Sequence, residues 1–157
     1  MILPVEVLSH EMENLKALPQ VDNMNRAALI VEDNKINLIV LKGILDKLGW
    51  QTISAENGQV ALDKLQSCHP DIIFMDCQMP VLDGYQTTRA IRKTEGKISG
   101  LPIFAITANA TSKSRDLCLA SGMNDFLSKP VRTNDVATLL DKWRYPSPIT
   151  GIDNKPH

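Results

Sequence analysis

The chain has 157 residues, of which 43 % are apolar, and its 17 basic and 18 acidic side chains give a formal net charge of -1. This length suits one domain with some tail, and the apolar fraction is too high for a disordered chain. The balanced charge gives no reason to expect nucleic-acid binding, which needs a concentrated basic face. No apolar run approaches the roughly 20 residues of a membrane span, and we expect no signal peptide at Met1–Pro4.

The three cysteines and three histidines are too scattered to indicate a metal site or a disulfide framework. They are Cys68, Cys77, Cys118, His10, His69 and His157. No CxxC pair occurs among them, so a reducing compartment such as the cytosol fits this sequence better than an oxidising one.

The first 26 residues differ in pattern from the rest of the chain. Apolar residues recur there at steps of three and four, as on one face of a helix, at Val5, Leu8, Met12, Leu15 and Leu18. Pro19 ends this stripe, and a polar linker follows. Two interpretations stay open: a frayed tail, because isolated helices this short are marginal, or a short helix that packs on the domain or on another copy. We therefore expect residues 1–26 to be a linker or helical lead, 27–145 the domain, and 146–157 a flexible tail.

From Ala27 onward, apolar runs alternate with segments of helical periodicity. The expected strands are Ala27–Val31, Gln51–Ala55, Asp71–Met75, Pro102–Ile106 and Asp125–Ser128. The expected helices are Lys35–Leu48, Gln59–Gln66, Tyr85–Lys93, Ser112–Ser121 and Thr133–Trp143, with Gly49 and Gly122 as C-caps and Thr133 as an N-cap. Apolar strands without clean alternation are typical of a parallel sheet covered on both faces, so the sequence predicts an α/β fold of five β/α units.

Four of the expected strands end in polar side chains. Glu32 and Asp33 follow the first strand, Asp76 the third, Thr107 the fourth and Lys129 the fifth. In an open α/β sheet, ligands bind beyond the carboxyl ends of the strands, where the strand order reverses. If the order is 2-1-3-4-5, the first and third strands are neighbours, and Asp33 and Asp76 face the same crevice.

These residue types together predict phosphoryl chemistry. Crowded carboxylates repel one another and need a cation, and hard oxygen ligands favour Mg²⁺, which also accepts phosphate oxygens. Lys129 and Thr107 supply a positive charge and a hydroxyl for phosphoryl oxygens, while the Asp76 carboxylate attacks phosphorus. Each residue alone is weak evidence, since a lone Asp at a strand end is usually a turn or cap residue.

The motifs at these positions resemble those of response-regulator receiver domains. They are Val31-Glu32-Asp33-Asn34, Met75-Asp76, Met79-Pro80, Asp83-Gly84, Thr107-Ala108 and Lys129-Pro130. The resemblance extends from about Ala27 to Tyr145, and Asn34 followed by Asn37 further resembles the receivers of hybrid sensor histidine kinases. It implies a flavodoxin-like (βα)5 doubly wound sheet with strand order 2-1-3-4-5.

The resemblance also implies a role for each residue of the metal site. Asp76 would be the phosphoacceptor, and Asp33 and Asp76 would bind Mg²⁺ together with the backbone carbonyl of Gln78. Glu32 would act through a bound water. The phosphoryl donor would be a histidine kinase or a histidine phosphotransfer domain, the transfer and the later dephosphorylation would be self-catalysed, and the location would be the cytoplasm or the cytosolic part of a membrane-bound kinase.

The same resemblance implies a conformational switch. Thr107 would move toward the phosphoryl group, Lys129 would pair with it, and Phe126 would swing inward. The Lys129–Pro130 peptide would be cis. Many members of the family have tyrosine where this chain has Phe126, so a switch here would rest on ring packing without a hydroxyl.

The helix Lys35–Leu48 carries more apolar residues than one core stripe requires, over an arc on the order of 200°. Ile36, Val40, Ile44 and Leu48 lie on one side, with Leu38, Leu41 and Leu45 next to them. One interpretation is a wide core contact. The other is a docking patch for a helical phosphodonor, anchored by Leu38, Leu41 and Leu45.

Competing functions lack residues that they would need. A phosphohydrolase of the haloacid-dehalogenase type requires a second Asp two residues after the nucleophile, where this chain has Gln78. A flavodoxin-type cofactor site would need a glycine-rich phosphate loop where Glu32 and Asp33 stand, and two carboxylates would repel an anionic cofactor. The intact set of polar groups also disfavours a purely structural domain.

Overall fold

The computed structural model describes residues 26–109, 111–143 and 145. The expected helical lead between Val5 and Leu18 and the tail from residue 146 lie outside the described residues. Five strands form one sheet in the order β2-β1-β3-β4-β5, and all four strand pairs are parallel. The strands are β1 (Ala27–Val31), β2 (Gln51–Ala55), β3 (Ile72–Asp76), β4 (Ile103–Thr107) and β5 (Asp125–Ser128). The predicted strand order is therefore confirmed.

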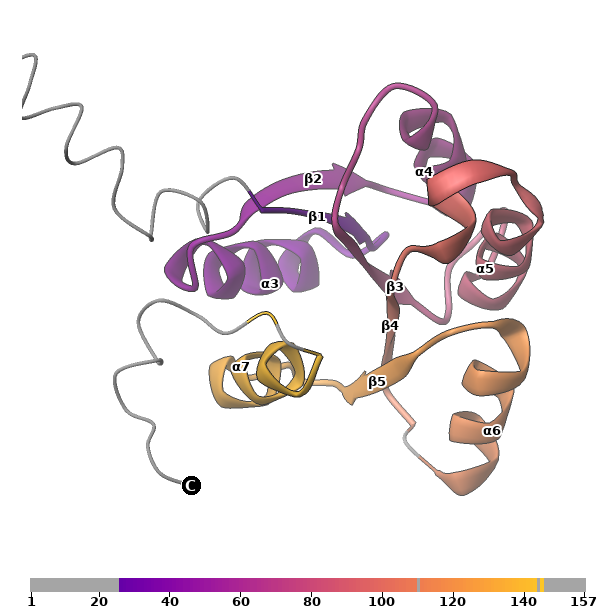
Figure 1. The fold of residues 1–157 in the computed structure, drawn as a ribbon. Helices are drawn as coiled ribbons and strands as arrows, with labels where there is room; N and C mark the ends of the chain where they lie inside the picture. The colour runs from indigo at the N-terminus through magenta and orange to yellow at the C-terminus, as the bar shows by residue number, and fades with distance from the viewer. Residues whose placement is uncertain (1–25, 110, 144, 146–157) are drawn as a thin grey trace, which may run out of the picture.

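Helices cover both faces of this sheet (Figure 1). One face carries α3 (Lys35–Lys47) and α7 (Thr133–Lys142), and the other carries α4 (Gly58–Leu65), α5 (Gly84–Lys93) and α6 (Ser112–Ser121). This is the flavodoxin-like three-layer arrangement, in which strand order reverses between β1 and β3.

Side chains along each strand alternate between the two layers of helices. Ile30 and Phe74 belong to the core cluster with α3 and α7, whereas Val31 and Met75 belong to the cluster with α4, α5 and α6. All four of these side chains have exposed fractions of 0 %. Burial on both faces explains why the strands read as continuous apolar runs in the sequence.

The helix boundaries match the predicted ones to within one residue. Gly49 follows the C-cap of α3 with a φ of 89°, a left-handed conformation that glycine adopts without steric cost. The predicted N-cap at Thr133 is wrong, because Arg132 takes that position without a side-chain cap and Thr133 is already helical. A 3-10 helix, η1 (Gly96–Gly100), was not predicted.

Arg92 of α5 joins the segments around η1 and the start of β5. Its Nε donates to the carbonyl of Gly122 at 2.9 Å, and Nη1 donates to those of Ser99 and Leu101 at 2.8 and 2.7 Å. Its Nη2 donates to Oδ1 of Asn124 at 2.8 Å. Burial lowers the pKa of Arg92, but the planar fork satisfies four acceptors at once and fixes the approach to β5.

Candidate functional site

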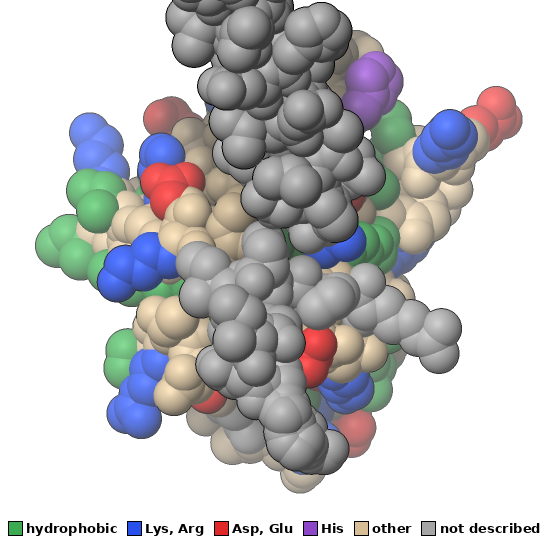
Figure 2. Space-filling model, turned by 60° about the vertical axis from the view of Figure 1, so that its left-hand side comes forward, with side chains coloured by type: hydrophobic (Ala, Val, Ile, Leu, Met, Phe, Trp, Pro, Cys, Tyr) green, Lys and Arg blue, Asp and Glu red, His purple; other side chains and the backbone are tan. Residues whose placement is uncertain are grey.

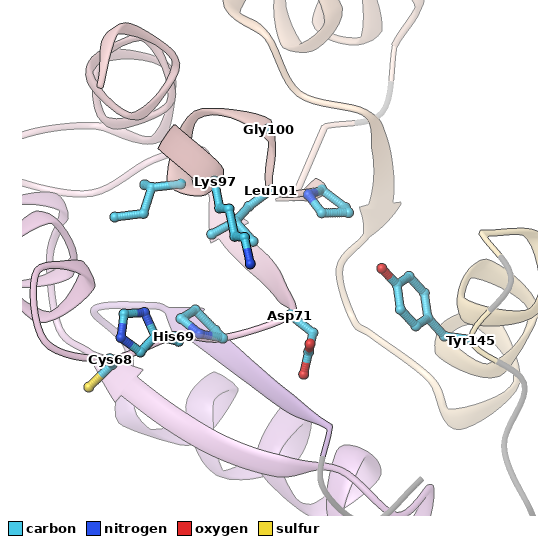
Figure 3. A pocket seen from close by; sticks show the side chains of 10 residues that line it. Cys68, His69, Asp71, Lys97, Gly100, Leu101 and Tyr145 are labelled. Atoms are coloured by element: carbon cyan, nitrogen blue, oxygen red, sulfur yellow. The ribbon is translucent and has the colours of Figure 1, made fainter. Parts of the chain in front are cut away.

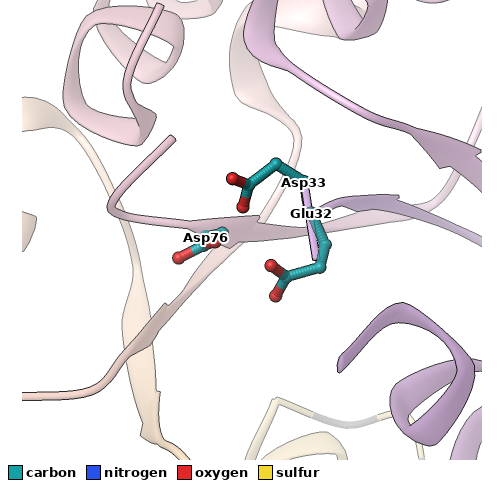
Figure 4. Close-up of side chains that lie close together, drawn as sticks. All are labelled: Glu32, Asp33 and Asp76. Carbon is teal, nitrogen blue, oxygen red and sulfur yellow. The ribbon is translucent and has the colours of Figure 1, made fainter. Parts of the chain in front are cut away.

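Three carboxylates meet at the carboxyl ends of β1 and β3. Oxygen atoms of Glu32, Asp33 and Asp76 all lie within 4.8 Å of one another. Figure 4 shows Glu32 and Asp33, which follow β1, beside Asp76 at the end of β3. Glu32 and Asp76 are buried, with exposed fractions of 3 % and 2 %, and Asp33 is exposed. The sheet thus brings together the three acidic residues that the sequence predicted to share a crevice.

Lys129 enters this cluster from the end of β5. Its Nζ lies 3.2 Å from Oδ1 of Asp76 and 3.6 Å from Oε1 of Glu32. The backbone N–H of Lys129 donates to the carbonyl of Thr107 at 2.8 Å, and the Lys129–Pro130 peptide is cis as expected. One cation therefore faces two buried carboxylates, which leaves the cluster with an excess of negative charge.

Glu32 holds a proton more tightly than an ordinary glutamate. Burial, followed by a side-chain hydrogen bond with Asp76, raises the pKa of Glu32 from 4.5 to about 7. The backbone N–H of Asn34, which donates to Oε2 at 3.1 Å, and the charge of Lys129 oppose this rise without cancelling it. The site as folded therefore favours either a proton or another cation between Glu32 and Asp76.

This raised pKa predicts how the stability of the metal-free domain depends on pH. Because folded Glu32 binds its proton more tightly than unfolded Glu32, the stabilisation is present below about pH 4.5 and is lost as the pH rises to about 7. We expect urea denaturation in EDTA to show a decline of up to about 3 kcal/mol across this window, partly offset by other groups. Glu32→Gln should flatten the decline, and an equally steep profile in that variant would contradict the assignment to Glu32.

The loop after β3 folds closely over the acceptor strand. The backbone N–H of Gln78 donates to Oδ1 of Asp76 at 3.2 Å, so this oxygen is held by the loop as well as by Lys129. A Cβ at Gly84 would lie 2.3 Å from the carbonyl oxygen of Asp76, which only glycine avoids. Val81 adopts a φ of 73° in a turn closed by a 2.8 Å hydrogen bond from Leu82 N–H to the Pro80 carbonyl. For a β-branched residue this conformation is strained.

The two residues of the expected switch lie on neighbouring strands, Thr107 at the end of β4 and Phe126 in β5. The hydroxyl of Thr107 accepts from the backbone N–H of Asn109 at 3.0 Å and donates to its carbonyl at 3.3 Å, so it is bonded to its own loop. Phe126 is half-buried at the edge of the core between the sheet and α6. The guanidinium carbon of Arg115 lies 4.9 Å from the centre of its ring, a contact that no pattern in the sequence predicts.

The predicted docking anchors are wrong for two of the three leucines. Leu41 and Leu45 are buried in the core, with exposed fractions of 2 % and 0 %, and Leu38 is partly buried against the same core. The helix instead turns other apolar residues outward: Ile36, Ile39 and Val40 are 72 %, 66 % and 45 % exposed. The core stripe of α3 is Leu41, Ile44 and Leu45, and Leu48 at the C-cap continues it.

A second cleft, of about 610 Å³, lies at the amino ends of β3 and β4 and thus at the opposite edge of the sheet. Figure 3 shows His69 and Lys97 on one side of it and Tyr145 across from them. On the face drawn in Figure 2, basic and acidic side chains are interspersed instead of forming a block of one sign. Within the ranges that the structure describes, no helix is long and apolar enough to cross a membrane.

Comparison with known proteins places this geometry in a family. Residues 28–141 match the family model of the response regulator receiver domain. The chain is 43 % identical over 122 residues to hybrid signal transduction histidine kinase A of Dictyostelium discoideum, and 39 % identical over 117 residues to sensor histidine kinase GacS of Pseudomonas protegens. These alignments cover 75 % and 73 % of the chain but only 6 % and 13 % of the relatives.

A solved structure agrees with the sequence comparison. The receiver domain of a sensor histidine kinase from Pseudomonas aeruginosa, with a magnesium ion coordinated in its active-site cleft, superposes with a TM-score of 0.69 at 40 % identity. That match covers 75 % of this chain and 96 % of the solved one. The chain therefore belongs to the response-regulator receiver domains of two-component and phosphorelay signalling, with relatives in hybrid histidine kinases.

Proposed function

We propose that Asp76 accepts a phosphoryl group from a phosphohistidine, with Mg²⁺ bound beside it, and that this modification switches or relays the signal. The observation that carries the proposal is the convergence of Glu32, Asp33 and Asp76 within 4.8 Å, with Lys129 3.2 Å from the proposed nucleophile. A buried aspartate next to a lysine could be a structural ion pair, but the third carboxylate makes the cluster anionic and suited to a divalent ion.

The residues present fit magnesium. Asp33 and Asp76 would hold the ion directly with the backbone carbonyl of Gln78, and Glu32 would hold it through water, giving the oxygen ligands that Mg²⁺ prefers. When bound, the ion supplies positive charge that offsets the carboxylates and the oxygens of the transferring group. The proposal extends to this chain the metal that occupies the cleft of the solved relative.

Side chains and backbone groups of the protein position the nucleophile and stabilise the transferring group. Lys129 and the N–H of Gln78 both donate to Oδ1 of Asp76 and so restrain the position of the attacking carboxylate. A bond forms between an oxygen of Asp76 and phosphorus as the bond between phosphorus and the donor histidine nitrogen breaks. The donor imidazole takes up a proton and leaves as a neutral ring. Lys129 pairs with the charge that moves to the phosphoryl oxygens, and Thr107 becomes a donor to one of them after releasing Asn109.

The test is the mass of the intact protein after incubation with acetyl phosphate and Mg²⁺. We expect the addition of one phosphoryl group, its absence when EDTA replaces Mg²⁺, and borohydride trapping of the acyl phosphate on the peptide that contains Asp76. Trapping at another residue, or labelling that is unaffected by EDTA, would overturn the proposal.

We further propose that the phosphodonor, a histidine kinase or a histidine phosphotransfer domain, docks on the exposed apolar residues of α3. Ile36, Ile39 and Val40 form this patch. Val40 also lines a small pocket with Glu32 and Lys129, so the patch lies directly beside the proposed site. An exposed apolar surface next to the reacting carboxylate is suited to hold a helix that carries the donor histidine.

Replacing the docking patch should slow transfer only from a protein donor. We expect Ile36→Ala with Ile39→Ala to lower the rate at subsaturating donor by about 10- to 100-fold, since exposed apolar anchors of this size each contribute about 1 kcal/mol or more to binding. Labelling by acetyl phosphate should stay unchanged. Leu119→Ala on α6, where Leu119 is 58 % exposed, is the matched control. Equal loss with both donors would reject the docking patch.

The predicted cytosolic location and the predicted domain limits at residues 27 and 145 stay predictions. The relatives named above are much longer than this chain, so a hybrid kinase that carries the domain is likewise a proposal.

A further inference from the structure

Phe126 occupies a defined place in the sheet relative to Thr107. In the register of β4 and β5, Phe126 pairs with Ala105 and Ser128 pairs with Thr107. Residues two apart on a strand share a face, so Ala105, Thr107 and Phe126 project toward the layer that contains α6. The ring therefore lies one residue pair away from the hydroxyl that is expected to move.

The side chains of β4 next to the Phe126 ring differ in size. Along this face of β4 the side chains are Ile103, Ala105 and Thr107, and the smallest of them stands beside Phe126. Ala105 is fully buried and Phe126 is only half-buried. If Thr107 breaks its hydrogen bonds to Asn109, the Phe126 ring can move inward over Ala105. The ring must then lose its contacts at the surface.

The ring of Phe126 contacts Arg115 of α6. Its guanidinium carbon is 4.9 Å from the ring centre, within the range of a cation–π interaction, and Arg115 is otherwise exposed. Of the described aromatic rings, those of Trp50 and Tyr145 also face an arginine, but Arg26 lies far from the switch at the amino end of β1. Among these arginine–aromatic contacts, that of Arg115 with Phe126 involves a residue of the expected switch.

We propose that Arg115 is a latch: its contact with the outward ring of Phe126 stabilises the unphosphorylated arrangement and sets how readily the switch engages. This inference rests on the proposed function of Asp76 and Thr107, and it assigns a regulatory role to a residue that makes no contact with the carboxylate cluster. Inward movement of the ring breaks the contact between Arg115 and Phe126. The whole free energy of this contact therefore favours the resting state over the switched state.

The expected size of the bias follows from the exposure of the pair. An exposed cation–π contact corresponds to a factor of about two to five in an equilibrium. When a ligand binds only the switched state, its apparent dissociation constant is inversely proportional to the population of that state. Removing the latch should therefore tighten the binding of a switched-state ligand by about two- to fivefold.

Beryllofluoride with Mg²⁺ is a suitable ligand because it stands in for the phosphoryl group on an aspartate. We expect Arg115→Gln to bind it about two- to fivefold more tightly than the wild type. Lys113→Gln, two residues earlier on α6, removes the same charge without touching the ring and should leave the affinity unchanged. In a Phe126→Leu background, Arg115→Gln should have no further effect, as the double-mutant cycle requires for an interaction through the ring. Equal effects of Arg115→Gln in both backgrounds, or of Arg115→Gln and Lys113→Gln, would overturn the latch.

A second measurement separates this inference from the proposed function. The chain has three phenylalanines, so fluorophenylalanine labelling gives three ¹⁹F resonances, of which Phe126→Leu removes one and thereby assigns it. In the metal-free, unmodified protein, Arg115→Gln should shift the Phe126 resonance toward its beryllofluoride-bound position, and Lys113→Gln should not. If no variant binds beryllofluoride, the proposed function fails. The latch is then judged by whether Arg115→Gln raises the mobility of the Phe126 ring, and an unchanged Phe126 resonance in this variant refutes the latch.

Discussion

Asp76→Asn should abolish the phosphoryl adduct and still leave the Mg²⁺-free domain at least as stable as the wild type. Asparagine keeps the shape of the side chain and an oxygen for Lys129 and Gln78, but it offers no carboxylate to attack phosphorus. It also removes one negative charge from a cluster in which Glu32 and Asp33 lie within 4.8 Å. Relief of this repulsion should raise the free energy of unfolding by about 1 kcal/mol.

Intact-mass analysis after acetyl phosphate treatment tests the first half of this expectation, and urea denaturation in EDTA tests the second. Asp63→Asn, an exposed aspartate on α4, is the control for loss of a negative charge elsewhere. Addition of Mg²⁺ should stabilise the wild type and much less the Asp76→Asn variant, because a ligand of the ion is lost. An adduct that persists in the variant would move the acceptor to another residue, and a large destabilisation would show that Asp76 serves mainly to hold the fold.

Lys129→Met should slow phosphorylation by acetyl phosphate by about 10² to 10³, the usual effect of removing one preorganised charge or donor at a reacting centre. Lys129 is the cation within 3.2 Å of Asp76 and 3.6 Å of Glu32, and methionine fills a similar volume without the charge. The pKa of Glu32 should rise further, because the charge of Lys129 is among the influences that now lower it. The variant should therefore lose stability as the pH rises above neutrality more steeply than the wild type.

The time course of adduct formation at fixed acetyl phosphate and saturating Mg²⁺ measures this effect. Lys142→Met is the matched control, since Lys142 pairs with Asp125 at 2.8 Å on α7 and does not face the carboxylate cluster. Lys129→Arg should recover part of the rate by restoring the charge. A Lys129→Met rate within a few-fold of the Lys142→Met rate would mean that Lys129 serves only as the structural counter-charge of two buried carboxylates.

The alternating pattern was sufficient to predict five β/α units, and the resemblance to receiver domains supplied the strand order that brings the acidic residues together. In a parallel sheet every strand begins at one edge and ends at the other, so polar residues that follow buried apolar runs must gather at the same edge. This rule places Glu32, Asp76 and Lys129 at the same edge, and applying it requires no information on side-chain geometry. Their contacts depend only on strand order, and a reversal between β1 and β3 places two of them side by side.

The exposed face of α3 could not be predicted in the same way. The apolar arc of this helix is wide enough to admit several rotations about its axis, and periodicity alone does not say which part of the arc meets the sheet. The structure buries Leu41 and Leu45 and exposes Ile36 and Ile39, so the predicted anchors and the actual surface differ by a rotation of the helix. The rotation is set by packing against β1, β3 and α7, which are distant in sequence.

Single contacts between distant residues also left no signal in the sequence. The contact of Arg115 with Phe126 depends on how α6 approaches β5 in space. The four hydrogen bonds of Arg92 likewise depend on how distant segments approach α5. The left-handed conformation of Val81 is a further case, because propensity predicts glycine or asparagine there and the surrounding loop imposes it on valine. Such features arise where tertiary structure overrides local preference.

The contact between Arg26 and Tyr145 shows where the two ends of the described domain lie. Arg26, immediately before β1, lies 5.4 Å from the ring centre of Tyr145, which follows α7, so the peptide chain enters and leaves the folded unit at nearly the same place. That place is at the amino edge of the sheet, about one strand length, roughly 16 Å, from the acidic edge. A reporter protein fused at either of these two positions would therefore stand away from the carboxylate cluster and should leave access to Asp76 unobstructed.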